Sequence, residues 1–215
     1  MTKRFLLVAG NIGAGKTSIT RTLADRLGWL AAHETVSDNP FLADFYGDMR
    51  QWSFHLQVYF LGDRADQHIQ MAAQTQSAII DRSIYEDFHI FARALLELGN
   101  MTQREYDAYR SVYELVVRSL PRPDLLLYLD APVQVLMDRI HNRGRAMESG
   151  ISPDYLALLE RYYREWIATF DLCPVLTIPA SDLNFVENER HIAIVIDRIQ
   201  EKLAGKEEVV FPNNL

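Results

Sequence analysis

Short apolar runs alternate along the chain with longer segments in which apolar residues recur every three or four positions. The uninterrupted runs indicate strands that are buried on both faces of a sheet. Five strands are expected, at residues 4–10, 29–34, 77–83, 124–130 and 174–179. Helices are expected at residues 16–28, 49–73, 85–98 and 103–120, from Pro132 onward, and at 153–170 and 188–204. Strands that alternate with helices predict an α/β fold with a parallel sheet.

Length and composition add limits to this picture. The 215 residues carry a formal net charge of −7 and a single cysteine, Cys173. We expect one domain over residues 1–215, with a tail at about 205–215, because no repeat or linker divides the chain. The acidic balance argues against a nucleic-acid partner, and one cysteine excludes an intrachain disulfide. No apolar run is long enough for a signal peptide or a membrane span, so we expect no membrane partner and a cytoplasmic location.

The stretch GNIGAGKT, residues 10–17, lies between the first expected strand and the first expected helix. It matches G-x-x-x-x-G-K-[ST], whose glycines let backbone N–H groups surround phosphate oxygens at a helix N-terminus. In this pattern Lys16 reaches the β- and γ-phosphates, and Thr17 holds Mg²⁺. The nucleotide-binding residues expected here are Gly10, Asn11, Ile12, Gly13, Ala14, Gly15, Lys16, Thr17 and Ser18. The sequence therefore predicts ATP or GTP binding.

The phosphate loop does not identify the acceptor of the phosphoryl group. Transfer to water would make the protein an NTPase, and transfer to a small molecule would make it a kinase. None of its lysines lies in an N/T-K-x-D sequence, which argues against a GTPase; they are Lys3, Lys16, Lys202 and Lys206. Motor and AAA-type ATPases are usually larger. A small-molecule kinase is the remaining interpretation.

Asp81 and Arg82 end the third expected strand. A carboxylate at this place in a P-loop enzyme associates with Mg²⁺. The carboxyl ends of parallel strands share one edge of a sheet, so both residues are expected beside the phosphate loop. We therefore assign Asp81 to the metal site and both residues to the catalytic site.

Three arginines, Arg139, Arg143 and Arg145, come close together, and two glycines loosen the backbone beside them. The spacing of Arg139 and Arg143 places both guanidinium groups on one face of a helix. Arginine binds phosphate through a bidentate fork and keeps its charge. This pattern indicates a lid at about residues 143–150 that closes over the transferring phosphoryl group.

Glu34 lies where the second expected strand ends, at the same sheet edge as the phosphate loop. An alcohol acceptor has a proton to lose, and a carboxylate near the γ-phosphate can take it. A monophosphate acceptor already carries oxyanions and needs no such base. Glu34 therefore favours a nucleoside over a nucleotide as the acceptor.

Together these residues resemble the deoxyribonucleoside kinase family, which includes deoxycytidine, deoxyguanosine and deoxyadenosine kinases. The resemblance rests on the order GNIGAGKT, Glu34, WSFHLQ (residues 52–57), DRS (81–83) and RIHNRGRAMESG (139–150), and it covers nearly the whole chain. It implies a P-loop kinase fold, with a five-stranded parallel sheet wrapped by helices and an arginine-bearing lid. It also implies a homodimer and a role in nucleotide salvage.

The resemblance assigns roles to individual side chains around the nucleoside. Glu34 resembles the base near the sugar 5′-hydroxyl, although some descriptions of the family give this role to the acid at the position of Asp81. Arg82 resembles the arginine that steadies the 5′-oxygen. Tyr46 and Glu148 resemble the pair that binds the 3′-hydroxyl. The residues expected to form the base slot are Leu56, Gln57, Arg64, Asp87 and Phe91.

The resemblance also assigns the donor side of the site. Arg139, Arg143 and Arg145 resemble lid contacts to the phosphates and adenine of ATP. The loop around residues 182–185, with Asp182, Asn184 and Phe185, resembles the one that holds adenine through its backbone. The chain departs from many relatives at Met147, which replaces an acidic residue before Glu148 and puts the hydrogen bonding of the lid in question.

Arg64 and Asp87 together predict which bases are accepted. Asp87 can accept from an exocyclic amino group, and Arg64 can donate to a ring nitrogen or carbonyl. Thymine has no amino group, and its O4 would face the carboxylate acceptor against acceptor, at a cost of about 1–3 kcal/mol. The stretch DNPFLADFY (38–46) resembles that of bacterial purine deoxynucleoside kinases. We therefore favour deoxyadenosine or deoxyguanosine, with deoxycytidine also compatible.

Two alternatives remain open at this point. A nucleoside monophosphate kinase such as thymidylate kinase would use an arginine on the acceptor's phosphate, and Arg82 could serve. A P-loop switch would bind the nucleotide and transfer nothing. The arginine lid and Glu34 have no purpose in a pure switch, which argues against the second alternative.

Overall fold

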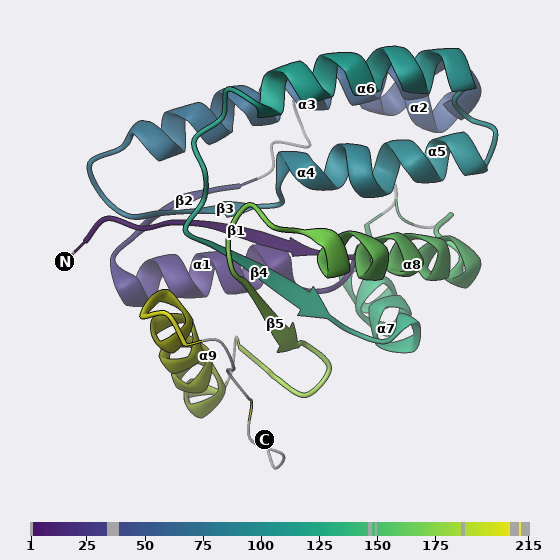
Figure 1. Cartoon of the computed structure of the whole chain (residues 1–215). Helices are drawn as coiled ribbons and strands as arrows, with labels where there is room; N and C mark the ends of the chain where they lie inside the picture. Colours follow the sequence, from purple (N-terminus) through teal and green to yellow (C-terminus); the bar gives the residue numbers. More distant parts are fainter. Residues whose placement is uncertain are drawn as a thin grey trace.

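Five parallel strands form the central sheet of the protein (Figure 1). The computed structural model describes residues 2–33, 39–145, 148, 150–185, 188–206 and 211. The strand order is β2-β3-β1-β4-β5, which confirms the predicted parallel α/β sheet. The strands are β1 (Phe5–Gly10), β2 (Leu30–Ala32), β3 (Ala78–Asp81), β4 (Leu125–Asp130) and β5 (Val175–Pro179).

The continuous apolar runs are explained by helices that cover both faces of the sheet (Figure 1). Successive side chains of a strand point to opposite faces. In β1, Leu6 and Val8 join one apolar cluster, whereas Leu7 and Ala9 join the other. Both clusters are buried, and β1 accordingly carries apolar residues on both faces. The continuous apolar runs in the sequence are therefore explained by a sheet that is buried on both faces.

One face is covered by α1 (Lys16–Leu27), α7 (Val133–Arg143) and α9 (Glu189–Leu203), which contribute to the cluster around Val8. The other face is covered by α3 (Met49–Ala73), α6 (Gln103–Val117) and the helical segment at residues 84–97. Helix α8 (Pro153–Thr169) contributes residues to both clusters. The predicted helices are thus all present.

Two features of the helical layer differ from the expected pattern. The helix expected at residues 85–98 consists of α4 (Ile84–Glu86), a π-helical segment η1 (Asp87–Ala92) and α5 (Arg93–Glu97). A short helix, α2 (Leu42–Gly47), was not expected, and it contains no buried residue. A π segment occurs as a single turn inside a longer helix, so the apolar positions around it still predict one helix. An isolated helix of one or two turns is too short for a periodic apolar pattern to identify it.

The fold brings the expected reactive positions to one edge of the sheet. The phosphate loop follows β1 and leads into the N-terminus of α1, while Asp81 is the last residue of β3. Val8 and Asp81 are paired in the register of these neighbouring strands. Parallel strands expose all their carboxyl ends at the same edge, so residues far apart in the sequence meet there. In the described part of the chain no helix is both long enough and apolar enough to cross a membrane.

Candidate active site

The phosphate loop depends on glycines at two close approaches. Gly13 has a φ of 84°, and a Cβ there would lie 2.8 Å from the carbonyl oxygen of Leu136. Gly10 has a φ of 151°, and its Cβ would lie 2.9 Å from the carbonyl oxygen of Leu129. A side chain at either position would collide with backbone. The loop can therefore wrap tightly enough to turn its N–H groups inward only because both positions lack a Cβ.

Lys16 is only 7% exposed, because its side chain folds back over the loop. Its Nζ donates to the carbonyl oxygen of Gly10 at 2.7 Å and to that of Asn11 at 2.9 Å. These bonds hold the ammonium group above the loop whose N–H groups are expected to bind phosphate. The structure therefore places the positive charge of Lys16 at the predicted phosphate site.

Thr17 and Asp81, the two expected metal ligands, are in direct contact. The hydroxyl of Thr17 donates to Oδ2 of Asp81 at 2.5 Å, and Asp81 is buried. Nδ1 of His33 lies 4.0 Å from the same oxygen. A hydroxyl and a carboxylate are the hard oxygen donors that Mg²⁺ prefers, usually completed by water and substrate phosphates. The residues present therefore fit a Mg²⁺ site at this position.

Arg82 adopts a backbone conformation that is rare for a residue with a side chain. Its φ is 73°, and among the described residues it is the only non-glycine with a positive φ. The left-handed region costs a non-glycine residue about 1–2 kcal/mol. The N–H of Arg82 donates to the carbonyl oxygen of Val8 at 2.9 Å, and its guanidinium lies over the ring of Phe91 at 4.6 Å. The left-handed turn and the ring of Phe91 thus fix the position of Arg82 directly after β3.

The polar residues expected in the base slot come together between α3 and η1, and all are buried. Gln57 and Arg64 lie two turns apart on α3, and Asp87 begins η1. Arg64 forms an ion pair with Asp87 and lies over the ring of Phe60 at 4.3 Å. Burial raises the pKa of Asp87 to about 6, against the opposing effect of the Arg64 charge. Leu56 is also buried on α3.

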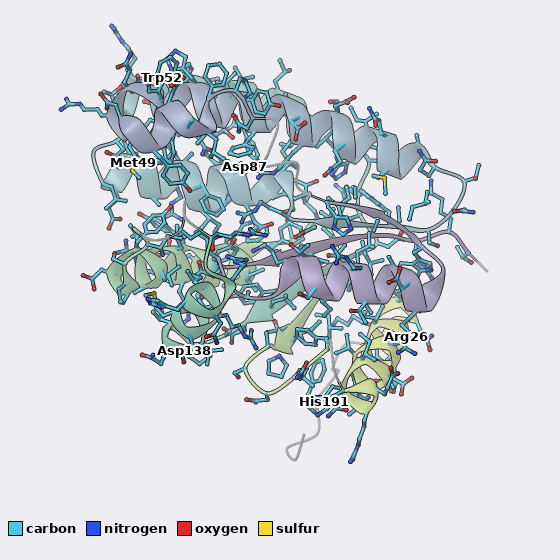
Figure 2. All side chains as sticks on the ribbon, turned by 180° about the vertical axis from the view of Figure 1, so that it is seen from behind. Arg26, Met49, Trp52, Asp87, Asp138 and His191 are labelled. Carbon is cyan, nitrogen blue, oxygen red and sulfur yellow. The ribbon has the colours of Figure 1, made fainter. Side chains whose placement is uncertain are left out.

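Two acceptor atoms in this slot have no hydrogen-bond partner among the described residues. They are Oε1 of Gln57 and Oδ2 of Asp87. Buried polar atoms are nearly always hydrogen-bonded, and leaving one unmade costs about 1–3 kcal/mol. Figure 2 shows Asp87 inside the molecule, below the long helices at the top of the view. The slot is therefore built to receive hydrogen-bond donors.

A cavity of about 470 Å³ opens on the other side of the phosphate loop. We call it the donor pocket. It is lined by residues of the phosphate loop, of α7, of the turn after β5 and of α9: Gly13, Gly15, Ser18, Arg139, Arg143, Ser181, Asp182, Leu183, Asn184, Phe185 and His191. All three residues expected in the adenine loop are among them. In Figure 2, His191 lies near the bottom of the view, well away from Asp87.

Sequence reasoning missed His191 in this pocket. Its Nδ1 accepts from the backbone N–H of Asn184 at 3.0 Å, so the first turn of α9 fixes the loop after β5. Asn188 caps the same helix by accepting from two backbone N–H groups, one of them that of His191. An N-cap asparagine three residues before a histidine was the available signal, because it places that histidine in the first turn, beside the loop.

Arg139 differs from the other two arginines of the predicted lid group. It donates to the carbonyl oxygen of Ala14 at 3.3 Å and to that of Ala180 at 2.6 Å. It therefore joins the phosphate loop to the turn after β5, while its side chain also lines the donor pocket. Partial burial lowers the pKa of Arg139 below its ordinary value.

The lid residues form an ion-pair cluster. Arg143 donates to both carboxylate oxygens of Glu148, at 2.7 to 3.0 Å, and Arg145 lies 3.6 Å from the same carboxylate. Tyr46, the expected partner of Glu148 at the sugar, lies on α2 with 45% of its surface exposed and contacts Phe45 edge-on. Glu34, the expected base, and Met147 lie outside the described residues.

Comparisons with known proteins agree with this geometry. The family model "Deoxynucleoside kinase" matches residues 6–204. The chain is 39% identical over 196 residues to a deoxyadenosine/deoxycytidine kinase of Bacillus subtilis, covering 90% of each chain. It is 35% identical over 207 residues to a deoxyguanosine kinase of Lactobacillus acidophilus, covering 92% of this chain and 90% of that one.

Solved structures of deoxyadenosine kinase from M. mycoides have the same fold. The structure with the products dCMP and dCDP superposes with a TM-score of 0.81 at 27% identity, covering 92% of this chain and 99% of that chain. The structure with bound dATP has a TM-score of 0.79 at 26% identity, with the same coverage of each chain. The matched region contains the phosphate loop, the carboxyl ends of β1 and β3, and the arginine cluster at residues 139–145. The chain belongs to the deoxynucleoside kinase family.

Proposed function

We propose that this kinase uses ATP and Mg²⁺ to phosphorylate the 5′-hydroxyl of a purine deoxynucleoside, deoxyadenosine or deoxyguanosine, and that it also accepts deoxycytidine. The names of the relatives support this range, because they include kinases of all three nucleosides. The product would be the 5′-monophosphate, as in nucleotide salvage.

The observation that carries the choice of base is the pair of buried acceptors without a partner in the described structure, Oε1 of Gln57 and Oδ2 of Asp87. Adenine, guanine and cytosine each carry an exocyclic amino group that can donate to such atoms. Arg64 can donate to the neighbouring ring nitrogen or carbonyl oxygen. Thymine has no amino group, and its single ring donor, the N3–H, can satisfy only one of the two acceptors, so the other would stay unsatisfied. The slot therefore selects by hydrogen-bond polarity.

The phosphoryl transfer itself depends on charges at the sheet edge. Lys16 offers its ammonium group to the β- and γ-phosphates, where negative charge builds up in the transition state. Mg²⁺, held by Thr17 and Asp81, would neutralise the phosphate oxygens. The guanidinium of Arg82 would contact the acceptor oxygen. Its position is set by the left-handed backbone at Arg82 and by the contact with Phe91.

We assign the proton-accepting role to Glu34. The hydroxyl of Thr17 already occupies one oxygen of Asp81, as expected of a carboxylate committed to the metal site. Glu34 directly follows His33, whose ring nitrogen lies 4.0 Å from Asp81. In the sequence, this carboxylate therefore directly follows a residue of the sheet edge, and we assign the 5′-hydroxyl proton to it. Tyr46 and Glu148 are assigned to the 3′-hydroxyl.

ATP would lie in the donor pocket. Its volume of about 470 Å³ is within the range of small-molecule sites. The adenine would contact the backbone of the loop at residues 182–185, and Arg143 and Arg145 would reach the phosphates from the lid. A triphosphate would compete with Glu148 for these guanidinium groups, since phosphate offers the same bidentate geometry as a carboxylate.

We also propose that the protein is a homodimer that pairs through α3 and α6. Five large apolar side chains on these helices are exposed: Met49, Val58, Ile69, Val112 and Leu115. The two helices lie side by side at one side of the molecule (Figure 1). A second copy of the same surface would cover these side chains. Sedimentation of the wild type and of Leu115→Glu would test this assembly.

The decisive experiment is a transfer assay with labelled ATP. The four deoxynucleosides and their 5′-monophosphates are offered separately, each with Mg²⁺. We expect phosphorylation of deoxyadenosine, deoxyguanosine and deoxycytidine, with thymidine at least tenfold lower in kcat/KM. Transfer to monophosphates alone would contradict the proposal and point to a nucleotide kinase. ATP binding without transfer to any acceptor would indicate a switch.

A further inference from the structure

Glu86 is a fully buried carboxylate at the end of α4, and no role was assigned to it above. Its Oε1 accepts from the backbone N–H of Gly10 at 3.2 Å and from the hydroxyl of Tyr163 at 2.6 Å. Its Oε2 accepts from the backbone N–H of Ser83 at 2.6 Å and from the hydroxyl of Ser83 at 3.0 Å. The carboxylate therefore lies at a junction of three chain segments.

Each of these segments belongs to the site. Gly10 begins the phosphate loop, and Ser83 directly follows Arg82. Tyr163 comes from α8, the helix after the lid, and its hydroxyl also lies 2.8 Å from the carbonyl oxygen of Gly10. A carboxylate has about four lone-pair positions, and here each oxygen receives two donors. Glu86 is thus saturated by groups that flank the reacting centre.

The capping-box pattern explains the two hydrogen bonds to Oε2 of Glu86. Ser83 and Glu86 form the reciprocal bonds that start a helix, a local device that needs only Oε2. Oε1 has no part in that device, and it reaches across 76 residues of sequence to the phosphate loop. A glutamate needed only for capping would be found at a helix start on the surface. Its complete burial against Gly10 indicates a second role.

We propose that Glu86 is a positioning residue that holds the phosphate loop in register with the turn carrying Arg82. It does not touch the substrate in this role. The N–H groups of Gly10 and Ser83 both donate to its carboxylate, which keeps their separation constant. Lys16 and Arg82 can then contact the same phosphoryl group. The proposal rests on the kinase reaction proposed above, because positioning is measured through that reaction.

Glu86→Gln tests this role with almost no change of volume. The amide has one acceptor oxygen, and its NH₂ group would face either the N–H of Gly10 or that of Ser83, donor against donor. One of the two links must therefore break. A displacement of about 1 Å in a reacting group can lower the rate about 10²-fold. We expect kcat to fall about 10²-fold, while KM for ATP and for the nucleoside each change less than about threefold.

Glu105→Gln is the matched control. Thr102 and Glu105 form the same kind of capping box at the start of α6, on the surface and outside the site. In this variant the amide oxygen can keep both local bonds, and no other segment is bound to Glu105 through its second oxygen, so we expect its kcat to equal that of the wild type. Thermal unfolding of both variants separates stability from activity. A Glu86→Gln enzyme with a lowered Tm and a wild-type kcat would show a purely structural role and overturn the proposal.

Tyr163→Phe provides a second test that does not depend on the folding of Glu86→Gln. It removes one donor to Oε1 and keeps the buried ring. We expect kcat to fall about threefold to tenfold. If both residues act through one junction, the double variant loses less than the product of the two single effects. An unchanged kcat in Tyr163→Phe, or effects that simply multiply, would contradict the junction.

The outcomes also distinguish this proposal from the proposed function. A wild-type enzyme that phosphorylates no deoxynucleoside would reject the function itself. A wild-type enzyme that transfers phosphate normally, together with unaffected Glu86→Gln and Tyr163→Phe variants, would reject only the positioning role.

Discussion

The base slot and the donor pocket differ in how they are built. The base slot consists of buried side chains, with the Arg64–Asp87 ion pair at its centre. The donor pocket consists of backbone loops, glycines and arginines that are partly exposed. A buried polar group without a partner is costly, whereas an exposed one can turn to water. The acceptor should therefore be selected strictly and the donor more loosely.

The largest expected effect is on the rate of phosphoryl transfer, the reaction between the ligands of the two regions. Glu34→Gln should lower kcat about 10²–10⁴-fold, because the amide cannot accept the 5′-hydroxyl proton. The loss should be equal for every accepted base, with a smaller change in nucleoside binding. Steady-state kinetics with each deoxynucleoside measure this.

Asp81→Asn is the comparison for that variant. It should also be slow, but its defect should shift with the Mg²⁺ concentration, because Asp81 contacts Thr17 at the metal position. A fully active Glu34→Gln enzyme would make Asp81 the base instead.

A second change tests the base slot alone. Arg64→Met together with Asp87→Ala removes a buried ion pair as a unit, which is gentler than leaving one charge unpaired. Activity should shift from amino-bearing bases toward thymidine by about 10–10³-fold in relative kcat/KM. KM for ATP should not change. If the order of the four nucleosides stays the same, these residues do not face the base.

The pH dependence tests the charge of the slot. The pKa of Asp87 is raised from 3.8 to about 6, so the folded protein holds this proton more tightly than the unfolded chain does. Its contribution to the free energy of unfolding therefore decreases as pH rises through this window. Activity has the opposite dependence, because only ionised Asp87 accepts with both oxygens. Below pH 6, kcat/KM for deoxyadenosine should fall about tenfold per unit.

The control for this profile is the double variant assayed with thymidine. It lacks Asp87 and should show no break near pH 6. The same break in the variant would show that a group other than Asp87 is responsible.

The smallest expected effect is in the donor pocket. His191→Ala removes the acceptor for the N–H of Asn184 and should loosen the loop after β5. We expect KM for ATP to rise about threefold to tenfold, with the order of the nucleosides unchanged. Arg190→Ala, at an exposed neighbouring position, is the control. A changed nucleoside order in His191→Ala would contradict the separation of the two regions.

The comparison also shows what the sequence could reveal. The phosphate loop and Asp81 were predictable because glycine spacing and apolar runs are local signals. The contact of Thr17 with Asp81 followed from the shared edge of parallel strands. The bridge from Arg139 to two carbonyl groups was not predictable, because it depends on the separation of three distant segments. The same holds for Glu86, whose capping pattern is visible in the sequence but whose link to Gly10 is not.

The left-handed backbone of Arg82 limits how variants of this enzyme with higher thermal stability can be selected. Glycine is the residue that such a backbone favours, so Arg82→Gly would relieve about 1 kcal/mol of local strain. The same substitution would remove the guanidinium that lies over the ring of Phe91 and is proposed to contact the acceptor oxygen. A laboratory screen for heat resistance alone would favour Arg82→Gly, because it relieves the backbone strain, and the selected enzyme would have a lower kcat. Selection at this position has to reward both properties at once.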